Sequence, residues 1–193
     1  MANKLNLPNA LTWGRIALIP VFIGVFYLPD AWCGEAMKNL LATVFFIAAA
    51  VTDWFDGYLA RALNQTSAFG AFLDPVADKL MVAAALIVLV QLGRLDALVA
   101  VIIIGREITI SALREWMARV GESASVAVAY VGKLKTAAQM IAIPMLLFGA
   151  PLLSINVPLI GNILIYVAAV LTLWSMVYYL HRALPQLLKH LDE

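Results

Sequence analysis

Cysteine, histidine and charged residues are all scarce in this chain. The single cysteine, Cys33, excludes an internal disulfide. The two histidines, His181 and His190, lie nine residues apart near the C-terminal end, and we interpret them as surface residues rather than metal ligands. Charged residues make up only 13% of the 193, and a net charge of +1 predicts no attraction to nucleic acid.

Apolar residues are correspondingly abundant. They are 64% of the chain and the mean hydropathy is +0.92, whereas soluble domains are about 45–50% apolar. A transmembrane helix needs about 20 apolar residues, so about six spans with short loops use the whole length. We therefore expect one all-α, polytopic membrane domain over residues 1–193. Its first apolar run, Ala10 to Leu28, is followed by no small-residue cleavage site, so we expect a first span rather than a signal peptide.

Hydrophobic periodicity predicts six transmembrane helices, at about 9–28, 37–60, 67–92, 97–118, 127–149 and 157–182. Most lysines and arginines near the span ends lie on the side that carries both termini, while Lys38 and Arg94 lie on the other. The positive-inside rule therefore predicts cytoplasmic termini. Cys33 falls in a loop on the outer side, where we expect a solvent-facing or interfacial thiol.

Four of the seven aspartates lie between residues 52 and 79. Asp53 and Asp56 are three residues apart, and Asp74 and Asp78 are four apart, so each pair occupies one face of its helix. One short turn joins the two predicted helices, so they are antiparallel neighbours whose carboxylates can converge. Small residues lie one helical turn from three of these aspartates and leave room for a large ligand: Gly57, Ala60 and Gly70.

Four carboxylates at a membrane boundary are costly unless cations neutralise them. Within residues 52–79 the only basic side chains are Arg61 and Lys79, and two positive charges do not balance four negative ones. Carboxylate oxygens suit magnesium or manganese, and magnesium binds through a few carboxylates together with substrate phosphates. We therefore expect two divalent cations that clamp a phosphate or diphosphate. The alternatives are pairing with arginines of other helices, or an ion or proton path.

The aspartate segment resembles the full signature of the CDP-alcohol phosphotransferase family, Asp53-x-x-Asp56-Gly57-x-x-Ala60-Arg61, then eight residues, then Gly70-x-x-x-Asp74-x-x-x-Asp78. The resemblance implies six transmembrane helices and a site at the cytoplasmic face. It implies that the four aspartates bind the two cations, which hold the diphosphate of a CDP-linked lipid, and that Asp78 is the candidate general base. It also implies a nucleotide pocket formed by Gly57, Ala60, Arg61 and Gly70.

A second set of residues, all basic, points to the alcohol. Arg106 and Arg114 lie eight residues apart, hence about 80° apart around a helix. Lys133 and Lys135 stand at the start of the next predicted helix. Arginine forks and lysine charges suit phosphate oxygens, so this set predicts a phosphorylated acceptor. For Arg114 and the two lysines the alternative is ordinary positive-inside topology or snorkelling.

Arg106 is harder to explain by topology, because it lies deeper in an apolar run, with Glu107 and Glu115 as possible partners. Between Asn6 and Met140 the chain is similar to the family members that use sn-glycerol 3-phosphate. That similarity implies phosphatidyl transfer from CDP-diacylglycerol, with release of CMP, by a homodimer in the bacterial inner membrane. It implies that Arg106, Arg114 and Lys135 bind the acceptor phosphate, and that the lipid-binding cavity is completed by Asn9, Thr12 and Arg15.

Other classes share part of this pattern. Membrane prenyltransferases also bind magnesium and diphosphate through paired aspartate motifs, but several helices separate their motifs, whereas one short loop joins them here. A carboxylate-lined transporter would carry its acids near the membrane midplane and show repeated halves, and neither is visible. Within the family, inositol-phosphate, serine, choline and cardiolipin-forming relatives stay open, although the basic set argues against uncharged acceptors.

Overall fold

The computed structural model describes residues 7–62, 68–119 and 130–189. These residues form six α-helices and one short 3₁₀ helix, with no strand among them: α1 (Leu7–Gly24), η1 (Val25–Tyr27), α2 (Glu35–Ala62), α3 (Ala68–Gln91), α4 (Ala97–Arg119), α5 (Tyr130–Phe148) and α6 (Val157–Lys189). The predicted all-α class and the six helices are confirmed. The largest difference is at the end of α6, which continues to Lys189 rather than ending near residue 182.

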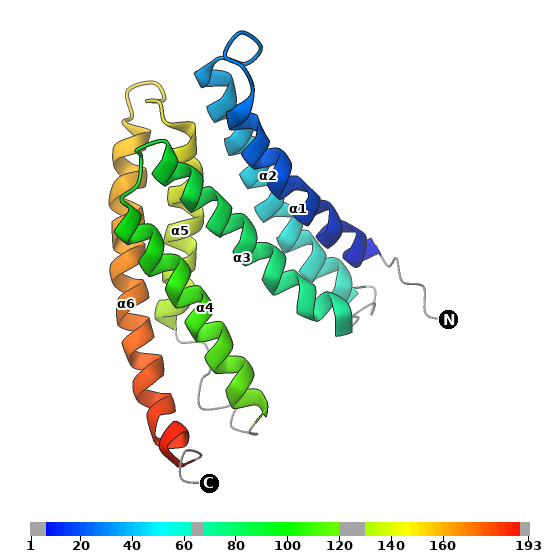
Figure 1. The fold of residues 1–193 in the computed structure, drawn as a ribbon, viewed down its shortest axis with the longest axis vertical. Helices are drawn as coiled ribbons and strands as arrows, with labels where there is room; N and C mark the ends of the chain where they lie inside the picture. The colour runs from blue at the N-terminus through cyan, green and yellow to red at the C-terminus, as the bar shows by residue number, and fades with distance from the viewer. Residues whose placement is uncertain (1–6, 63–67, 120–129, 190–193) are drawn as a thin grey trace.

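Glycine residues and polar side chains cap helices in the loops at the upper end of the bundle in Figure 1. Gly93 and Gly149 follow α3 and α5 with φ of +67°, a left-handed conformation that glycine adopts without a steric penalty. The carboxylate of Asp96 accepts the backbone N–H of Leu98 at 2.7 Å at the start of α4, and the amide oxygen of Asn156 does the same for α6 at 3.1 Å.

The helices pack in two groups, α1 to α3 and α4 to α6. In Figure 1, α1 and α2 lie beside α3, and α6 packs against both α4 and α5; between the groups, α2 contacts α5, and α3 contacts α4 and α5. The main core lies where the groups meet, and its fully buried members include Phe22, Leu86, Leu89, Ile103 and Ile143. A second, smaller core joins α4 to α6 through Ile110, Met117 and Tyr179.

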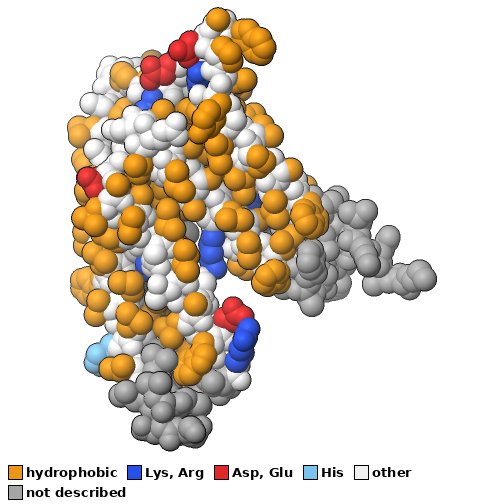
Figure 2. All heavy atoms as spheres, in the orientation of Figure 1, with side chains coloured by type: hydrophobic (Ala, Val, Ile, Leu, Met, Phe, Trp, Pro, Cys, Tyr) orange, Lys and Arg blue, Asp and Glu red, His pale blue; other side chains and the backbone are white. Residues whose placement is uncertain are grey.

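The face of the bundle drawn in Figure 2 is rich in hydrophobic side chains. Two helical segments in the described residues are long and apolar enough to cross a membrane, Glu35–Asp53 and Val157–His181, and only 28% of each is buried. The core helix of a soluble protein would be mostly buried. Val170, Trp174 and Val177 of α6, for example, are each more than 60% exposed. Apolar surface on this scale is typical of helices that face lipid or a partner.

Cys33 is buried, and the prediction of an exposed thiol is wrong. The loop before α2 folds into a tight turn, in which the backbone N–H groups of Trp32 and Cys33 both donate to the carbonyl of Pro29, at 2.9 and 3.1 Å. The turn carries the Cys33 side chain inward and leaves Trp32 83% exposed.

The predicted site residues lie away from the loops at the upper end of Figure 1. Away from the upper loops the two groups diverge in Figure 1: α1 begins and α2 ends at the right, beside the start of α3, whereas α4 and α6 end at the bottom. The aspartate segment and the basic set both lie toward the helix ends opposite the upper loops.

Candidate active site

The carboxylate half of the candidate site lies where α1, α2 and α3 approach one another. Asp53 is on the last turns of α2, and Asp74 and Asp78 are on the first turns of α3. All three side chains are partly exposed, and Gly70 is buried one turn before Asp74. Five other predicted site residues lie on α1 and α2 with side chains outside the described part of the structure: Asn9, Asp56, Gly57, Ala60 and Arg61.

Two polar residues of α1 bind this carboxylate half. The guanidinium of Arg15 donates to Asp53 at 2.5 Å, and the hydroxyl of Thr12 donates to Asp74 at 2.6 Å. Thr12 and Arg15 are 1% and 3% exposed, so both are buried in the protein interior. The charge balance argued from residues 52–79 alone left out Arg15, and pairing with an arginine of another helix is therefore part of the arrangement.

Asp78 and Arg15 line the same small cavity. Its wall also includes Ala49 and Ala50 of α2 and Met140 of α5. The cavity is thus bounded by four helices, with one carboxylate and one guanidinium as its charged groups among the lining residues. Small side chains on α2 help to leave this space open.

The carboxylates fit a hard divalent cation by donor chemistry. The described donors are carboxylate oxygens on partly exposed side chains, the ligand type that magnesium and manganese take. Among the described residues no group of three or more aspartate, glutamate, histidine or cysteine side chains is already gathered as a metal site. The side chain of Asp56, the fourth predicted ligand, lies outside that description.

The basic half of the site is built on Glu107 of α4. One oxygen of this carboxylate accepts from Arg106 at 3.2 Å and also from the ammonium group of Lys135 of α5. Arg106 and Lys135 are 6% and 2% exposed. Of the two partners that the sequence offered for Arg106, Glu107 is thus the one used, whereas Glu115 pairs with Arg119 at 2.6 Å.

Helix α6 completes the basic half. The guanidinium carbons of Arg106 and Arg114 lie 5.7 and 5.5 Å from the centre of the Tyr179 ring, within the range of a cation–π contact. Arg106 also donates to the hydroxyl of Ser175 at 3.3 Å. Sequence reasoning missed Ser175 and Tyr179, although a signal was present: with Thr172 they are polar residues at spacings of three and four in a largely apolar part of the helix. All three are buried.

The structure therefore brings together the three predicted phosphate ligands, Arg106, Arg114 and Lys135. With Glu107 among them, the cluster carries a formal charge of +2. The Nε atoms of Arg106 and Arg114 are buried and have no hydrogen-bond partner among the described residues. Buried donors of this kind are usually satisfied, so the cluster has unused capacity for an oxygen-rich anion.

A carboxylate half and a cationic half in one helical bundle suit the transfer of a phosphoryl group between two phosphorylated substrates. The family model for CDP-alcohol phosphatidyltransferase matches residues 5–174, and the chain belongs to this family. The family inferred from the aspartate signature is confirmed.

Several relatives are similar to the chain over nearly all its length. A protein of Shigella flexneri serotype 5b is 51% identical over 96% of this chain and 98% of its own. One of Pectobacterium atrosepticum is 50% identical over 96% and 99%, and one of Escherichia coli is 51% identical over 96% and 98%. Each of the three is named CDP-diacylglycerol–glycerol-3-phosphate 3-phosphatidyltransferase.

Proposed function

We propose that this protein transfers the phosphatidyl group of CDP-diacylglycerol to sn-glycerol 3-phosphate, giving phosphatidylglycerophosphate and CMP. The observation that carries the proposal is the cluster of Arg106, Arg114 and Lys135, which lies, like the signature aspartates, toward the helix ends opposite the upper loops. Relatives at about half identity that are named for this reaction support it.

The donor half binds the CDP-lipid. Asp53, Asp56, Asp74 and Asp78 would hold two divalent cations, magnesium or manganese. Such ions neutralise phosphate oxygens and stabilise the charge on a leaving phosphate. Arg15 and Thr12 orient Asp53 and Asp74 through the hydrogen bonds that they donate. The residues proposed to surround the nucleotide and its lipid are Asn9, Thr12, Arg15, Gly57, Ala60, Arg61 and Gly70.

The acceptor half selects a phosphate monoester. A formal charge of +2 matches the charge of about −2 that a phosphate monoester carries near neutral pH. The guanidinium groups make this recognition geometrically specific, because each can donate two parallel hydrogen bonds to phosphate oxygens. Neutral acceptors such as glycerol would leave the buried guanidinium donors unpaired, which is unfavourable.

Asp78 is proposed as the general base. It takes the proton from the free primary hydroxyl of glycerol 3-phosphate, and the hydroxyl oxygen forms a bond to the β-phosphorus of CDP-diacylglycerol. The bond from that phosphorus to the bridging oxygen breaks, and CMP leaves with the electron pair. Asp78 lines a cavity with Arg15, so a cation is beside the carboxylate that accepts the proton.

We further propose that all six helices span the bacterial inner membrane, with both termini and the site on the cytoplasmic side. The apolar outer faces of α2 and α6 support this placement, as does the excess of basic residues at the site end. The lipid would enter sideways from the bilayer, while glycerol 3-phosphate arrives from the cytoplasm. A homodimer is the expected assembly by resemblance to the family.

CMP release by the purified protein tests the proposal. The assay supplies CDP-diacylglycerol with magnesium or manganese, and compares sn-glycerol 3-phosphate with inositol phosphate, serine and glycerol. We expect release only with glycerol 3-phosphate and a divalent ion. Release with another acceptor would overturn the acceptor assignment and leave the family intact, whereas no release with any acceptor would reject the activity.

A further inference from the structure

Tyr179 holds an unusual position in the basic half of the site. Its side chain has no exposed surface, although it lies near the end of an apolar helix whose outer face is open. The guanidinium carbons of Arg106 and Arg114 both lie within 6 Å of its ring centre, at 5.7 and 5.5 Å. One ring on α6 therefore contacts two cations that are eight residues apart on α4.

Two guanidinium groups that share a site repel each other, and each has many rotamers. The negative face of an aromatic ring attracts cations, and burial strengthens this attraction because water does not screen it. A buried ring in contact with two arginines therefore attracts both guanidinium groups. Ser175, one turn earlier on α6, adds a hydrogen bond to Arg106 at 3.3 Å.

We propose that Tyr179 is a positioning residue for the acceptor phosphate: its ring orients the guanidinium groups of Arg106 and Arg114 so that both reach one phosphate. The inference rests on the proposed function, because it concerns the same acceptor site. It assigns α6 a part in selecting the acceptor, beyond that of a helix facing lipid. Tyr179 acts through the arginines, and its hydroxyl is not required.

Steady-state kinetics of Tyr179→Leu test the proposal. Leucine keeps an apolar side chain in the α4–α6 core but removes the ring. We expect the KM for glycerol 3-phosphate to rise about tenfold or more, and the KM for CDP-diacylglycerol to change by less than about twofold, because the ring contacts the two arginines of the acceptor half. Tyr179→Phe keeps the ring and should restore the KM for glycerol 3-phosphate to within about twofold of the wild-type value.

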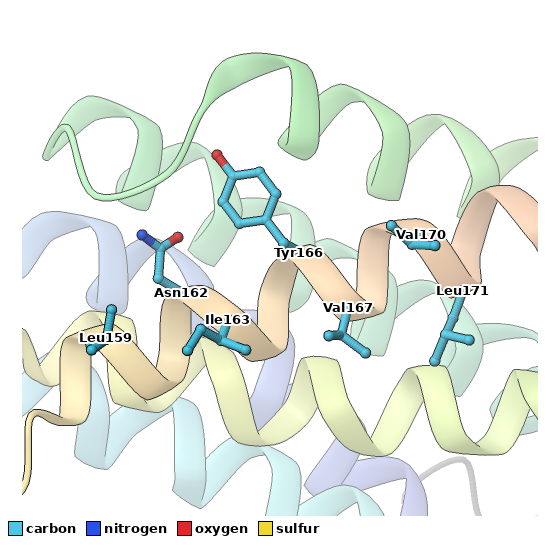
Figure 3. Close-up of a pocket in the computed structure, with 7 residues that line it drawn as sticks. All are labelled: Leu159, Asn162, Ile163, Tyr166, Val167, Val170 and Leu171. Carbon is cyan, nitrogen blue, oxygen red and sulfur yellow. The ribbon is translucent and has the colours of Figure 1, made fainter.

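Tyr166→Leu is the matched control, because it makes the same substitution on the same helix. Tyr166 is 48% exposed and lines a shallow groove on the outer side of α6 with Ile163, Val167 and Val170, as Figure 3 shows. We expect both KM values of this variant to equal those of the wild-type protein. An unchanged KM for glycerol 3-phosphate in Tyr179→Leu would overturn the proposal, as would equal rises for both substrates or a Tyr179→Phe variant as impaired as Tyr179→Leu.

A second experiment keeps the proposal testable if Tyr179→Leu fails to fold. Phenylalanines carrying one, two or three ring fluorines, incorporated at position 179, keep the shape of the ring while weakening its negative face. The KM for glycerol 3-phosphate should then rise stepwise with each fluorine, and a flat series would overturn the proposal. The wild-type protein separates this inference from the proposed function: if it releases no CMP with glycerol 3-phosphate, the function fails, whereas an active wild type with a flat series rejects only the role of Tyr179.

Discussion

Arg15 and Asp53 form an ion pair between α1 and α2, with Nη1 of the arginine 2.5 Å from Oδ1 of the aspartate. The arginine side chain is 1% exposed, whereas the aspartate side chain is 40% exposed. A cation of the protein itself therefore shares the charge of an aspartate that the proposed function assigns to metal binding. The buried arginine is shielded from water, so the ion pair with this carboxylate helps to compensate its lost hydration.

Replacing Arg15 by alanine should make the protein more dependent on divalent ions. Without the guanidinium, Asp53 loses its partner, and we expect a loss of about 1–3 kcal/mol of stability in the absence of divalent ions. Saturating magnesium should then raise the melting temperature more than in the wild-type protein, because the guanidinium no longer competes for Asp53. Thermal melting in detergent with and without magnesium measures both effects.

Arg119→Ala is the control for this experiment. Arg119 also pairs with a carboxylate, Glu115, at 2.6 Å, but the two side chains are 76% and 67% exposed. Exposed pairs of this kind contribute about 0–1 kcal/mol. The melting temperature and the magnesium effect should both match the wild-type protein. Identical magnesium shifts in Arg15→Ala and wild type would show that Arg15 and the ion do not compete.

Thr12→Val should separate the hydrogen bond to Asp74 from the packing of α1. Valine keeps the shape of threonine but cannot donate to the carboxylate, which Thr12 reaches at 2.6 Å. Hydrogen bonds to charged groups contribute about 1.5–3 kcal/mol. We expect a loss of this size in the free energy of unfolding, together with lower CMP release. Thr52→Val is the matched control, since the Thr52 hydroxyl only donates to the carbonyl of Ala48 in its own helix, and it should change neither quantity.

The helices and the general location of the site could be predicted from the sequence because both depend on local patterns. Apolar runs separated by glycine, proline and charged loops give the helix bounds to within a few residues, except at the end of α6. The spacing of Asp74 and Asp78 places both on one helical face whatever lies opposite. The placement of the aspartate and basic clusters toward the helix ends opposite the upper loops follows from the alternating direction of the helices.

The partners of these residues could not be predicted, because they depend on which helices touch. Nothing in the local sequence indicates that Arg15 reaches Asp53, 38 residues away, or that Arg106 reaches Ser175, 69 residues away. Tyr179 lies in the last helix, where apolar and aromatic residues are expected to face lipid. Its burial against α4 is a consequence of the packing of α6 on α4, which periodicity alone does not give.

Arg94 should stabilise the end of the bundle opposite the site. Its guanidinium donates to the carbonyls of Leu146 and Leu147 at the end of α5, at 3.2 and 2.8 Å, and to Glu35 of α2 at 3.2 Å. It also lies where a Cβ on Gly149 would stand. We expect Arg94→Ala to lose about 1–3 kcal/mol of stability, because it leaves carbonyls without donors. Thermal melting measures the loss.

Two controls test the reason given for the expected loss of stability in Arg94→Ala. Both KM values should stay at the wild-type level in Arg94→Ala, because the residue lies in the loop between the C-terminal end of α3 and the N-terminal end of α4, whereas the site residues lie toward the other ends of these helices. Glu35→Ala should cost only about 0–1 kcal/mol, because the carboxylate of this pair is 80% exposed. If the Glu35 variant lost as much stability as the Arg94 variant, the ion pair and not the carbonyl contacts would be responsible.

Asp30 should titrate below the usual carboxyl value. The hydrogen bond from Lys38 at 2.7 Å, together with the positive charge of that lysine, holds the pKa of Asp30 below 3.8. Because the pKa of Asp30 is lower in the folded protein, the ion pair stabilises the fold at any pH above the unfolded pKa of 3.8. This stabilisation is lost as the pH falls through the lower pKa of the folded state. Carbon-13 NMR of the labelled carboxyl group measures it. In Lys38→Ala the pKa should return to about 3.8, and an identical pKa in both proteins would contradict the prediction.

Asp78→Asn should abolish turnover without loss of the fold. Asparagine is nearly the same shape but cannot take a proton, and general bases contribute about 10²- to 10⁴-fold to rates. CMP release should therefore fall by at least about 100-fold. The melting temperature should not fall, because the substitution also removes the repulsion between Asp78 and the nearby Asp53. Asp96→Asn is the control: Asp96 caps α4 at the opposite end, asparagine caps helices equally well, and its rate should be unchanged. A near-normal rate in Asp78→Asn would reject Asp78 as the base and leave the other signature carboxylates as the candidates.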